Sequence, residues 1–282
     1  MNVFQFDTIN DGYIALVKKL LTEPDDFQEV KIEGAGKGKL VNKRSRYHLR
    51  NVHIIFKNPG LFTEFTVGDE ERSKVMNDYL NKERELFDKG EINSNEMGKI
   101  SKIWKLIENP DETINANYGY MTFHLKDTRA SYDLPVFNNY KLDSPVDESE
   151  QKNYMSQFEW CKNRLKNNVN SLQAYMHFNR PKDQYLDNND QPCTMFCQFM
   201  VTNNKLNFIS YMRSNDIIYG TPYNLAYFKT LQERMLNYLN DECGHKLEFG
   251  YLHHNATSLH LYENKIELAE KIVKGAENLS AK

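Results

Sequence analysis

The sequence is poor in cysteine, with only four among its 282 residues. So few cysteines in a long, lysine-rich chain do not form a disulfide framework of the kind that stabilises small secreted domains. The chain also lacks any apolar run near the roughly 18 residues that a membrane-spanning helix needs. Its first residues reach an acid at Asp7 and show no basic stretch before an apolar core, so no secretion signal is indicated. We therefore expect a reduced, cytoplasmic protein.

An excess of positive charge is absent as well. The formal net charge is -3, which argues against nucleic-acid binding because such binding needs a basic face. Residues 36–50 are a local exception, with six lysines and arginines and no acid. This segment is interpreted either as a solvated loop or as a mobile clamp for an anion. Its "GAGKGK" run is not a phosphate-binding P-loop, because no Ser or Thr follows the Gly-Lys pair.

Hydrophobic residues make up 40% of the chain, which provides ample material for a core. Apolar periodicity predicts helices, and β-rich runs bounded by turn residues predict strands. The expected helices span residues 11–22, 71–90, 154–168 and 221–244. The expected strands span residues 51–60, 171–181, 193–202 and 205–216, and residues 246–273 are expected to form a strand, a loop and a helix. Long helices between strands, without regular alternation, predict a single α+β domain over residues 1–282.

Cys193 and Cys197 lie four residues apart in an expected strand. On one face of a regular strand they would be about 13 Å apart, too far for a shared metal ion or a disulfide. Cys197 lies among phenylalanines, which predicts burial as a small apolar residue. Cys193 follows Pro192 at the start of the strand, where its side chain can face a cavity. The Asn-Asn pair at 203–204 predicts a hairpin turn into the next expected strand. A nucleophilic cysteine needs a nearby cation to lower its pKa, and Arg213 near the end of that next strand could approach Cys193 across the turn.

Three histidines, at positions 253, 254 and 260, raise the question of a metal site. No carboxylate or thiol lies at ligand spacing from them. A polar loop is therefore the favoured interpretation of this stretch, and no metal is expected.

Several segments, taken together, resemble the thymidylate synthase family, and more closely its phage-type deoxycytidylate/deoxyuridylate hydroxymethylase branch. The resemblance runs from about residue 79 to residue 262 in one order. The segments that carry it are "YLNKEREL" (79–86), "KIWKLIENPDETINANYGY" (102–120), "PCTMFCQF" (192–199), "MRSNDIIYGTPYNLA" (212–226) and "SLHLYENK" (258–265). It implies a large mixed or antiparallel sheet flanked by helices, and a homodimer formed through the sheet.

The resemblance implies a role for each matching residue around the reacting ring. Cys193, which is followed by threonine as in the hydroxymethylases, would be the nucleophile. Arg213 and Ser214 would hold the nucleotide phosphate, and Arg213 would also lower the pKa of Cys193. Asp216 would lie by the base, and Asn224 would bind the pyrimidine edge.

Further roles follow from the other matching segments. His260 and Tyr262 would bind the 3′-hydroxyl of the sugar. Trp104, a folate-binding residue in this match, and Tyr118 would shape the active-site cavity. Glu83 matches the catalytic glutamate, although an exposed helix carboxylate is the alternative for that residue taken alone.

The match departs from the family pattern at the phosphate site. Arg46 is a weak match to the family's mobile phosphate arginine. Leu172 and Gln173 replace two arginines that cross to the other subunit in the family. Losing such charge-assisted contacts would cost about 1.5–3 kcal/mol each, so either residues 36–50 compensate or the substrate is not a simple 5′-monophosphate. The chain also ends 20 residues after Tyr262, which implies a tail shorter than the one that closes over folate in the family.

The chemistry of these residues agrees with a one-carbon transfer. Attack of Cys193 on C6 of a pyrimidine would make C5 nucleophilic toward methylenetetrahydrofolate. A synthase then reduces the resulting exocyclic methylene, whereas a hydroxymethylase adds water, and Glu83 would hold the water and proton relay. The Asn224 amide both donates and accepts, which matches the O4/N3–H edge of uracil, whereas the cytosine-specific branch has Asp there.

We therefore expect a homodimeric enzyme that hydroxymethylates C5 of a pyrimidine nucleotide, most simply dUMP, with methylenetetrahydrofolate and water. Three alternatives remain open at this point. One is thymidylate synthase activity, another is an unusual acceptor such as a nucleoside or nucleotide sugar, and the third is nucleotide binding without turnover.

Overall fold

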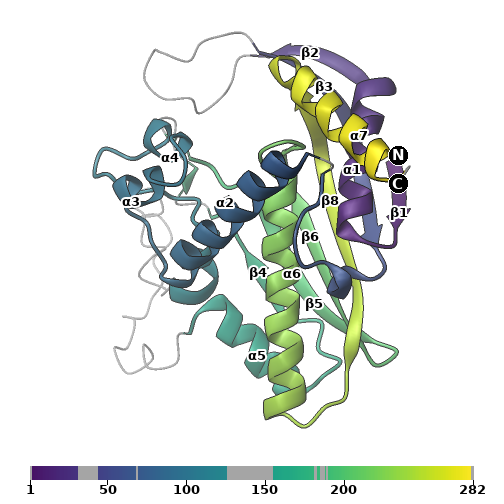
Figure 1. Ribbon diagram of the computed structural model, residues 1–282. Helices are drawn as coiled ribbons and strands as arrows, with labels where there is room; N and C mark the ends of the chain where they lie inside the picture. Colours follow the sequence, from purple (N-terminus) through teal and green to yellow (C-terminus); the bar gives the residue numbers. More distant parts are fainter. Residues whose placement is uncertain are drawn as a thin grey trace.

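The computed structural model describes residues 2–30, 44–67, 69–125, 155–180, 183–184, 188 and 190–280. The described strands form one eight-stranded sheet in the order β1-β3-β8-β6-β5-β4, with β2 paired to β3 and β7 paired to β8 (Figure 1). The strands are β1 (Asn2–Phe6), β2 (Asp26–Val30), β3 (Arg44–Phe56), β4 (Tyr175–His177), β5 (Thr194–Thr202), β6 (Lys205–Met212), β7 (Asn215–Asp216) and β8 (Glu248–Tyr262).

The sheet is mixed. β1 runs parallel to β3, and β6 and β7 run parallel to β8, while the remaining neighbours are antiparallel. The α-helices are α1 (Ile9–Thr22), α2 (Glu70–Asp88), α3 (Ser94–Gly98), α4 (Ile103–Leu106), α5 (Gln157–Asn167), α6 (Thr221–Asn237) and α7 (Ile266–Ser280). The expected fold class, a large mixed sheet flanked by helices, is confirmed. No helix in the described ranges is long and apolar enough to cross a membrane.

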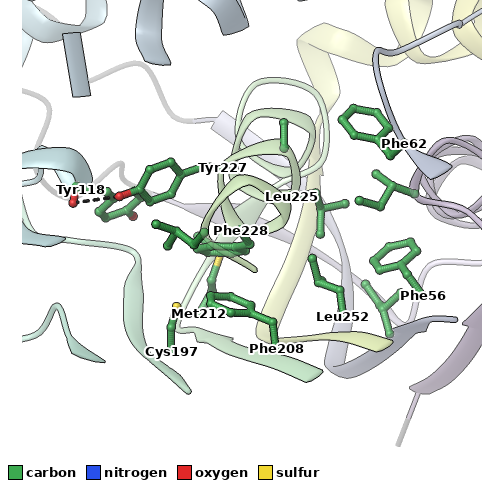
Figure 2. Close-up of a cluster of buried hydrophobic side chains, with 14 of the residues drawn as sticks. Phe56, Phe62, Tyr118, Cys197, Phe208, Met212, Leu225, Tyr227, Phe228 and Leu252 are labelled. Atoms are coloured by element: carbon green, nitrogen blue, oxygen red, sulfur yellow. Dashed lines mark hydrogen bonds between the residues drawn. The ribbon is translucent and has the colours of Figure 1, made fainter. Parts of the chain in front are cut away.

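Helix α6 lies against the middle of the sheet and forms the centre of the core (Figures 1 and 2). Its Leu225 and Phe228 are fully buried, as are Phe208 and Leu252 on the strands below. The Phe208 and Phe228 rings lie 5.7 Å apart. Each such side chain contributes about 1.5–3 kcal/mol on burial, so α6 holds its first turn firmly at the edge of the site described below.

The expected hairpin between β5 and β6 is confirmed. Asn203 and Asn204 form its turn with positive φ angles of 49° and 60°. Two successive residues of this kind are typical of a type I′ turn, whose twist matches that of the strands, and asparagine tolerates this conformation better than most residues. The turn sets the register that brings the start of β5 beside the end of β6.

Two expectations about loops are wrong where the structure describes the residues. The predicted loop around His253 and His254 is part of β8, a single strand between β3 and β6. Its polar side chains stay inside the sheet because neighbouring strands supply partners: His254 Nδ1 lies 2.9 Å from Ser210 Oγ. Within the predicted basic loop 36–50, residues 44–50 are in β3, paired to strands on both sides, and residues 36–43 lie outside the described residues.

Candidate active site

A cavity of about 280 Å³ opens between α2, the segment 103–118, the segment 190–193 and the first turn of α6. Seven residues predicted from the sequence line it: Glu83, Trp104, Tyr118, Cys193, Ser214, Asp216 and Asn224. These residues come from four of the segments quoted above, 79–86, 102–120, 192–199 and 212–226, and the fold places all four around one cavity. The predicted residues Arg46, Arg213, His260 and Tyr262 are not part of this lining.

Cys193 lies immediately before β5, and backbone contacts fix its position. Its carbonyl accepts a hydrogen bond of 2.9 Å from the Arg213 amide. The next amide, that of Thr194, donates to the Tyr118 hydroxyl at 3.1 Å. The strand begins only at Thr194 and its pairing register shifts before Phe196, so the expected regular strand from Cys193 to Cys197 does not hold. Cys197 is fully buried, as predicted.

The charges around the Cys193 thiol oppose one another. Burial raises its pKa above the ordinary value, the Arg213 guanidinium lowers it, and the carboxyls of Asp190 and Asp216 raise it further. Arg213 therefore lowers the pKa of Cys193, as predicted, but burial has the larger effect and the net pKa shift is upward. In the protein alone the thiol, rather than the thiolate, dominates at neutral pH.

Arg213 is held close to this thiol by the segment that carries it. Its Nε donates to the Pro192 carbonyl at 3.1 Å, and its Nη2 donates to the Gln191 carbonyl at 2.9 Å. The side chain is otherwise exposed. The cation thus remains beside Cys193 while part of the guanidinium faces solvent.

Glu83 lies on the buried face of α2, together with the apolar residues Met76, Leu80 and Phe87. The residue is 8% exposed, which excludes the alternative of an exposed helix carboxylate. Its Oε1 accepts a hydrogen bond of 2.9 Å from the Tyr79 hydroxyl. Burial raises the pKa of Glu83 to about 7, against the smaller lowering effect of Tyr79. A carboxyl with this pKa can both give and accept a proton near neutral pH.

Aromatic side chains form much of the remaining wall. Trp104 comes from the short helix α4, and the Tyr79 and Tyr223 rings lie 4.5 Å apart where α2 meets α6. Tyr118 is buried, and its carbonyl accepts a hydrogen bond from the Tyr227 hydroxyl of α6 at 3.2 Å (Figure 2). Flat apolar walls of this kind suit a planar ring system.

Glycine 119 allows the Tyr118 segment to lie directly on α2. A Cβ at this position would collide with the backbone of Phe87. The absence of a side chain at Gly119 therefore sets how close Tyr118 comes to the helix that carries Glu83.

The opposite side of the cavity is formed by the segment between β6 and α6. Asp216 Oδ1 accepts hydrogen bonds from the amides of Ile218 and Tyr219, at 2.8 and 3.2 Å, and so shapes the turn into α6. Asn224 lies in the first turn of that helix, with its Nδ2 3.5 Å from Met212 Sδ. Asn224 thus lines the cavity, and its amide contacts a sulfur atom, which is a weak hydrogen-bond acceptor.

His260, Tyr262 and Arg46 lie together in the ladder between β3 and β8. Arg46 pairs with Tyr262, and His48 pairs with His260. Arg46 is thus a strand residue, and the expectation of an arginine on a mobile loop is wrong. His260 is 3% exposed, and burial followed by the charge of Arg46 lowers its pKa to about 3, so its imidazole is neutral. Its carbonyl accepts from the Ile217 amide at 2.9 Å, which ties this ladder to the site.

Leu172 and Gln173, where the sequence match departs from the family pattern, lie just before the edge strand β4. Leu172 is 65% exposed, and its carbonyl accepts from the Gln198 side chain at 2.8 Å. Among the described residues, no lysine or arginine lines the cavity, while three carboxyls do. No cluster of three or more His, Cys, Asp or Glu residues suited to a metal ion occurs in the described part of the chain.

Asp190 is a buried carboxyl of the cavity wall that was not predicted from the sequence. This carboxyl is only 4% exposed, and its Oδ2 accepts hydrogen bonds from the amides of Asn115 and Ala116 at 2.6 and 2.7 Å. Burial raises its pKa to about 6. The only signal was its position in the polar run before Cys193, which is more typical of a solvated loop.

Comparison with known proteins adds to this geometry. The profile of the family described as "Thymidylate synthase" matches residues 12–281. The deoxycytidylate 5-hydroxymethyltransferase of Enterobacteria phage T4 is 25% identical over 203 residues, which cover 70% of this chain and 72% of that protein. A thymidylate synthase of Mycoplasma mobile is 35% identical over 80 residues, 28% of this chain and 26% of that protein. The structure of the thermostable thymidylate synthase A from Bacillus subtilis has the same fold, with a TM-score of 0.62 and 18% identity over 95% of this chain and 84% of that one.

The buried carboxyl of Glu83 predicts a pH-dependent stability. Below about pH 4.5 it is protonated in both the folded and unfolded states, whereas between 4.5 and its folded pKa of about 7 only the unfolded chain ionises. Wild type therefore loses stability as the pH rises from about 4.5 to about 7, above which both states are ionised, and Glu83→Gln does not. Relative to wild type, the variant should gain about 3 kcal/mol in free energy of unfolding between pH 5 and pH 8.

Urea denaturation at the two pH values measures this difference. Glu85→Gln, an exposed position on the same helix, is the matched control and should show no such gain. An equal gap between Glu83→Gln and wild type at both pH values would contradict the raised pKa.

Proposed function

Because the chain belongs to the thymidylate synthase family, it is a one-carbon transferase acting on C5 of a pyrimidine nucleotide, and we propose that it hydroxymethylates a uracil nucleotide, most simply dUMP. Methylenetetrahydrofolate is the proposed co-substrate, and water is the second reactant. The single observation that carries this proposal is the shared cavity, in which Cys193, Glu83 and Asn224 meet.

Cys193 supplies the nucleophile. Its sulfur forms a bond to C6 of the ring as the S–H proton passes to solvent, and the electron pair of the C5–C6 double bond moves to C5, which attacks the one-carbon unit. Arg213, bound to the carbonyls of Gln191 and Pro192, stabilises the developing thiolate. Since burial holds the unliganded cysteine as a thiol, deprotonation belongs to the liganded state.

Glu83 lies on another wall of the cavity, where it transfers protons and holds the reacting water. Its carboxyl lies within hydrogen-bond distance of Tyr79, and its pKa of about 7 lets it exchange a proton during turnover. In a hydroxymethylase, after C5 has lost its proton and the folate has left, water adds to the exocyclic carbon while the C6–S bond breaks, which restores the C5–C6 double bond and releases Cys193. A buried carboxyl in the same cavity as Cys193 is suited to hold that water.

The residues of the cavity fit the proposed co-substrate. When bound, methylenetetrahydrofolate supplies the one-carbon unit. Trp104, Tyr79, Tyr219 and Tyr223 provide aromatic surfaces for its planar ring system, and their apolar faces exclude bulk water from the reacting atoms. Asp216 lies among them and offers a carboxylate to ring N–H groups.

A homodimer through the sheet is part of the proposal. The sheet presents partly exposed aromatic side chains, including Tyr211 at 37% and Tyr175 at 40% exposure, and the Phe196 and Tyr211 rings stack at 4.9 Å. A second copy of the chain would cover these side chains.

One observation favours a second candidate, an acceptor other than a simple 5′-monophosphate. The described cavity lining contains three carboxyls and no cation, and uncharged Leu172 and Gln173 stand where the family has arginines. A nucleoside or a sugar-extended nucleotide would need fewer cationic contacts than a terminal phosphate.

The mass of the product tests the proposed reaction. The protein is incubated with methylenetetrahydrofolate and, separately, with dUMP, dCMP, deoxyuridine and UDP-glucose, and each pyrimidine is then analysed by mass spectrometry. We expect dUMP to gain one CH₂O unit. A gain of one CH₂ unit with dihydrofolate formed would instead show a synthase, and no product with any acceptor would contradict both.

Asn224 should set the choice between uracil and cytosine. Its amide donates to O4 and accepts from N3–H of uracil, whereas a carboxyl suits the cytosine edge. Asn224→Asp should therefore lower kcat/KM for the uracil nucleotide about 100-fold or more and raise that for the cytosine nucleotide. Competition assays with both nucleotides measure this ratio. Asn237→Asp, exposed at the far end of α6, is the control; an unchanged ratio in Asn224→Asp would exclude this role.

A further inference from the structure

Asp190 is a buried carboxyl in the cavity wall for which the proposed reaction has no task. It is 4% exposed and lies three residues before Cys193. Buried carboxylates are uncommon and require hydrogen-bond partners or a function. Its hydrogen-bond partners and the charged groups around it both connect it to Cys193.

The carboxyl joins two segments that are remote in sequence. Its Oδ2 accepts from the amides of Asn115 and Ala116, at 2.6 and 2.7 Å. Asn188 reinforces the same junction, because its Oδ1 accepts from Asn115 Nδ2 at 3.0 Å and from the Asp190 amide at 2.8 Å. Asn188 and the segment 190–193 are therefore attached to the segment 115–118 through side-chain hydrogen bonds.

This junction encloses Cys193. The segment that Asp190 holds continues into Tyr118, whose hydroxyl accepts from the Thr194 amide at 3.1 Å. One contact thus lies three residues before the cysteine and the other lies directly after it. Together they determine the position of the sulfur relative to the wall that carries Tyr118.

The charge of Asp190 acts on the same sulfur. The groups that face Cys193 are Arg213 from the end of β6, Asp216 of β7, Tyr118 and Asp190 itself. Asp183 is the other carboxyl that faces Asp190. Arg213 is the cation of this group, and the carboxylates oppose it. A thiol is also far less prone to oxidation than a thiolate.

We propose that Asp190 is a positioning residue for the nucleophile: its carboxylate attaches the Tyr118 segment to the Cys193 segment, and its negative charge opposes that of Arg213 at the Cys193 sulfur. This role rests on the proposed function of Cys193 as the nucleophile. Asp190 thus provides a structural contact and also influences the reactivity of Cys193. A single substitution can separate these two effects.

Asp190→Asn performs the separation. Asparagine keeps the size and one oxygen that accepts from the two amides, but it removes the charge. The rate of Cys193 alkylation by iodoacetamide is measured between about pH 6 and 10 by mass spectrometry of the Cys193 peptide. We expect the midpoint of this pH profile to fall by roughly one unit, and the rate at neutral pH to rise up to about tenfold. Asp241→Asn, exposed and outside the cavity lining, should match wild type.

An unchanged midpoint in Asp190→Asn would overturn the proposal even if turnover fell, because a purely structural role leaves the profile in place. The contact is tested by hydrogen exchange at the amides of Asn115 and Ala116. These amides should exchange faster in Asp190→Ala and stay protected in Asp190→Asn, and equal protection in both variants would also overturn the proposal. If Asp190→Ala does not fold, the alkylation profile of Asp190→Asn decides.

Alkylation requires no turnover, so the two proposals fail separately. A shifted alkylation profile in a protein that forms no product with any acceptor would leave control of Cys193 by Asp190 intact while contradicting the proposed reaction.

Discussion

The site depends on a balance between the burial of the Cys193 thiol and the charge of Arg213. Burial favours the neutral thiol and the guanidinium favours the thiolate, and burial is the larger effect. The cation is bound to the carbonyls of the segment that carries the cysteine, so the two groups cannot separate without disrupting the start of β5. The hairpin between β5 and β6, set by Asn203 and Asn204, brings them together. A substrate that shields the thiolate from the apolar walls would shift this balance toward attack.

Different walls of the cavity carry residues with different chemical roles. Cys193 lies on the strand side beside Arg213, whereas Glu83 lies on α2 within an aromatic lining that raises its pKa to about 7. Helix α6 connects these walls, because its Tyr227 binds the carbonyl of Tyr118 (Figure 2) while its first turn presents Asn224. The described lining contains three carboxyls and no lysine or arginine, and this observation supports the proposed alternative of an acceptor other than a simple 5′-monophosphate.

Much of the fold and part of the site could be predicted because the signals were local. The periodicity of α6 and the Asn-Asn turn depend on neighbouring residues, and the motif around Cys193 resembles a known segment. Asp190 could not be found in this way, because its burial depends on amides about 75 positions away in the chain. The same holds for His254, which is stable inside a strand only because Ser210 of a neighbouring strand binds it. The net pKa shift of Cys193 could not be predicted either, because it depends on all the groups that surround the buried thiol.

The central claim is that Cys193 activates C5 of a pyrimidine by adding to C6. Its most direct measurement is the release of tritium from C5 of the labelled nucleotide in the presence of methylenetetrahydrofolate. Wild-type protein should release tritium, and Cys193→Ser should release it at least about 1,000-fold more slowly. Equal release by the two proteins would show that C5 is activated without this sulfur and would contradict the account.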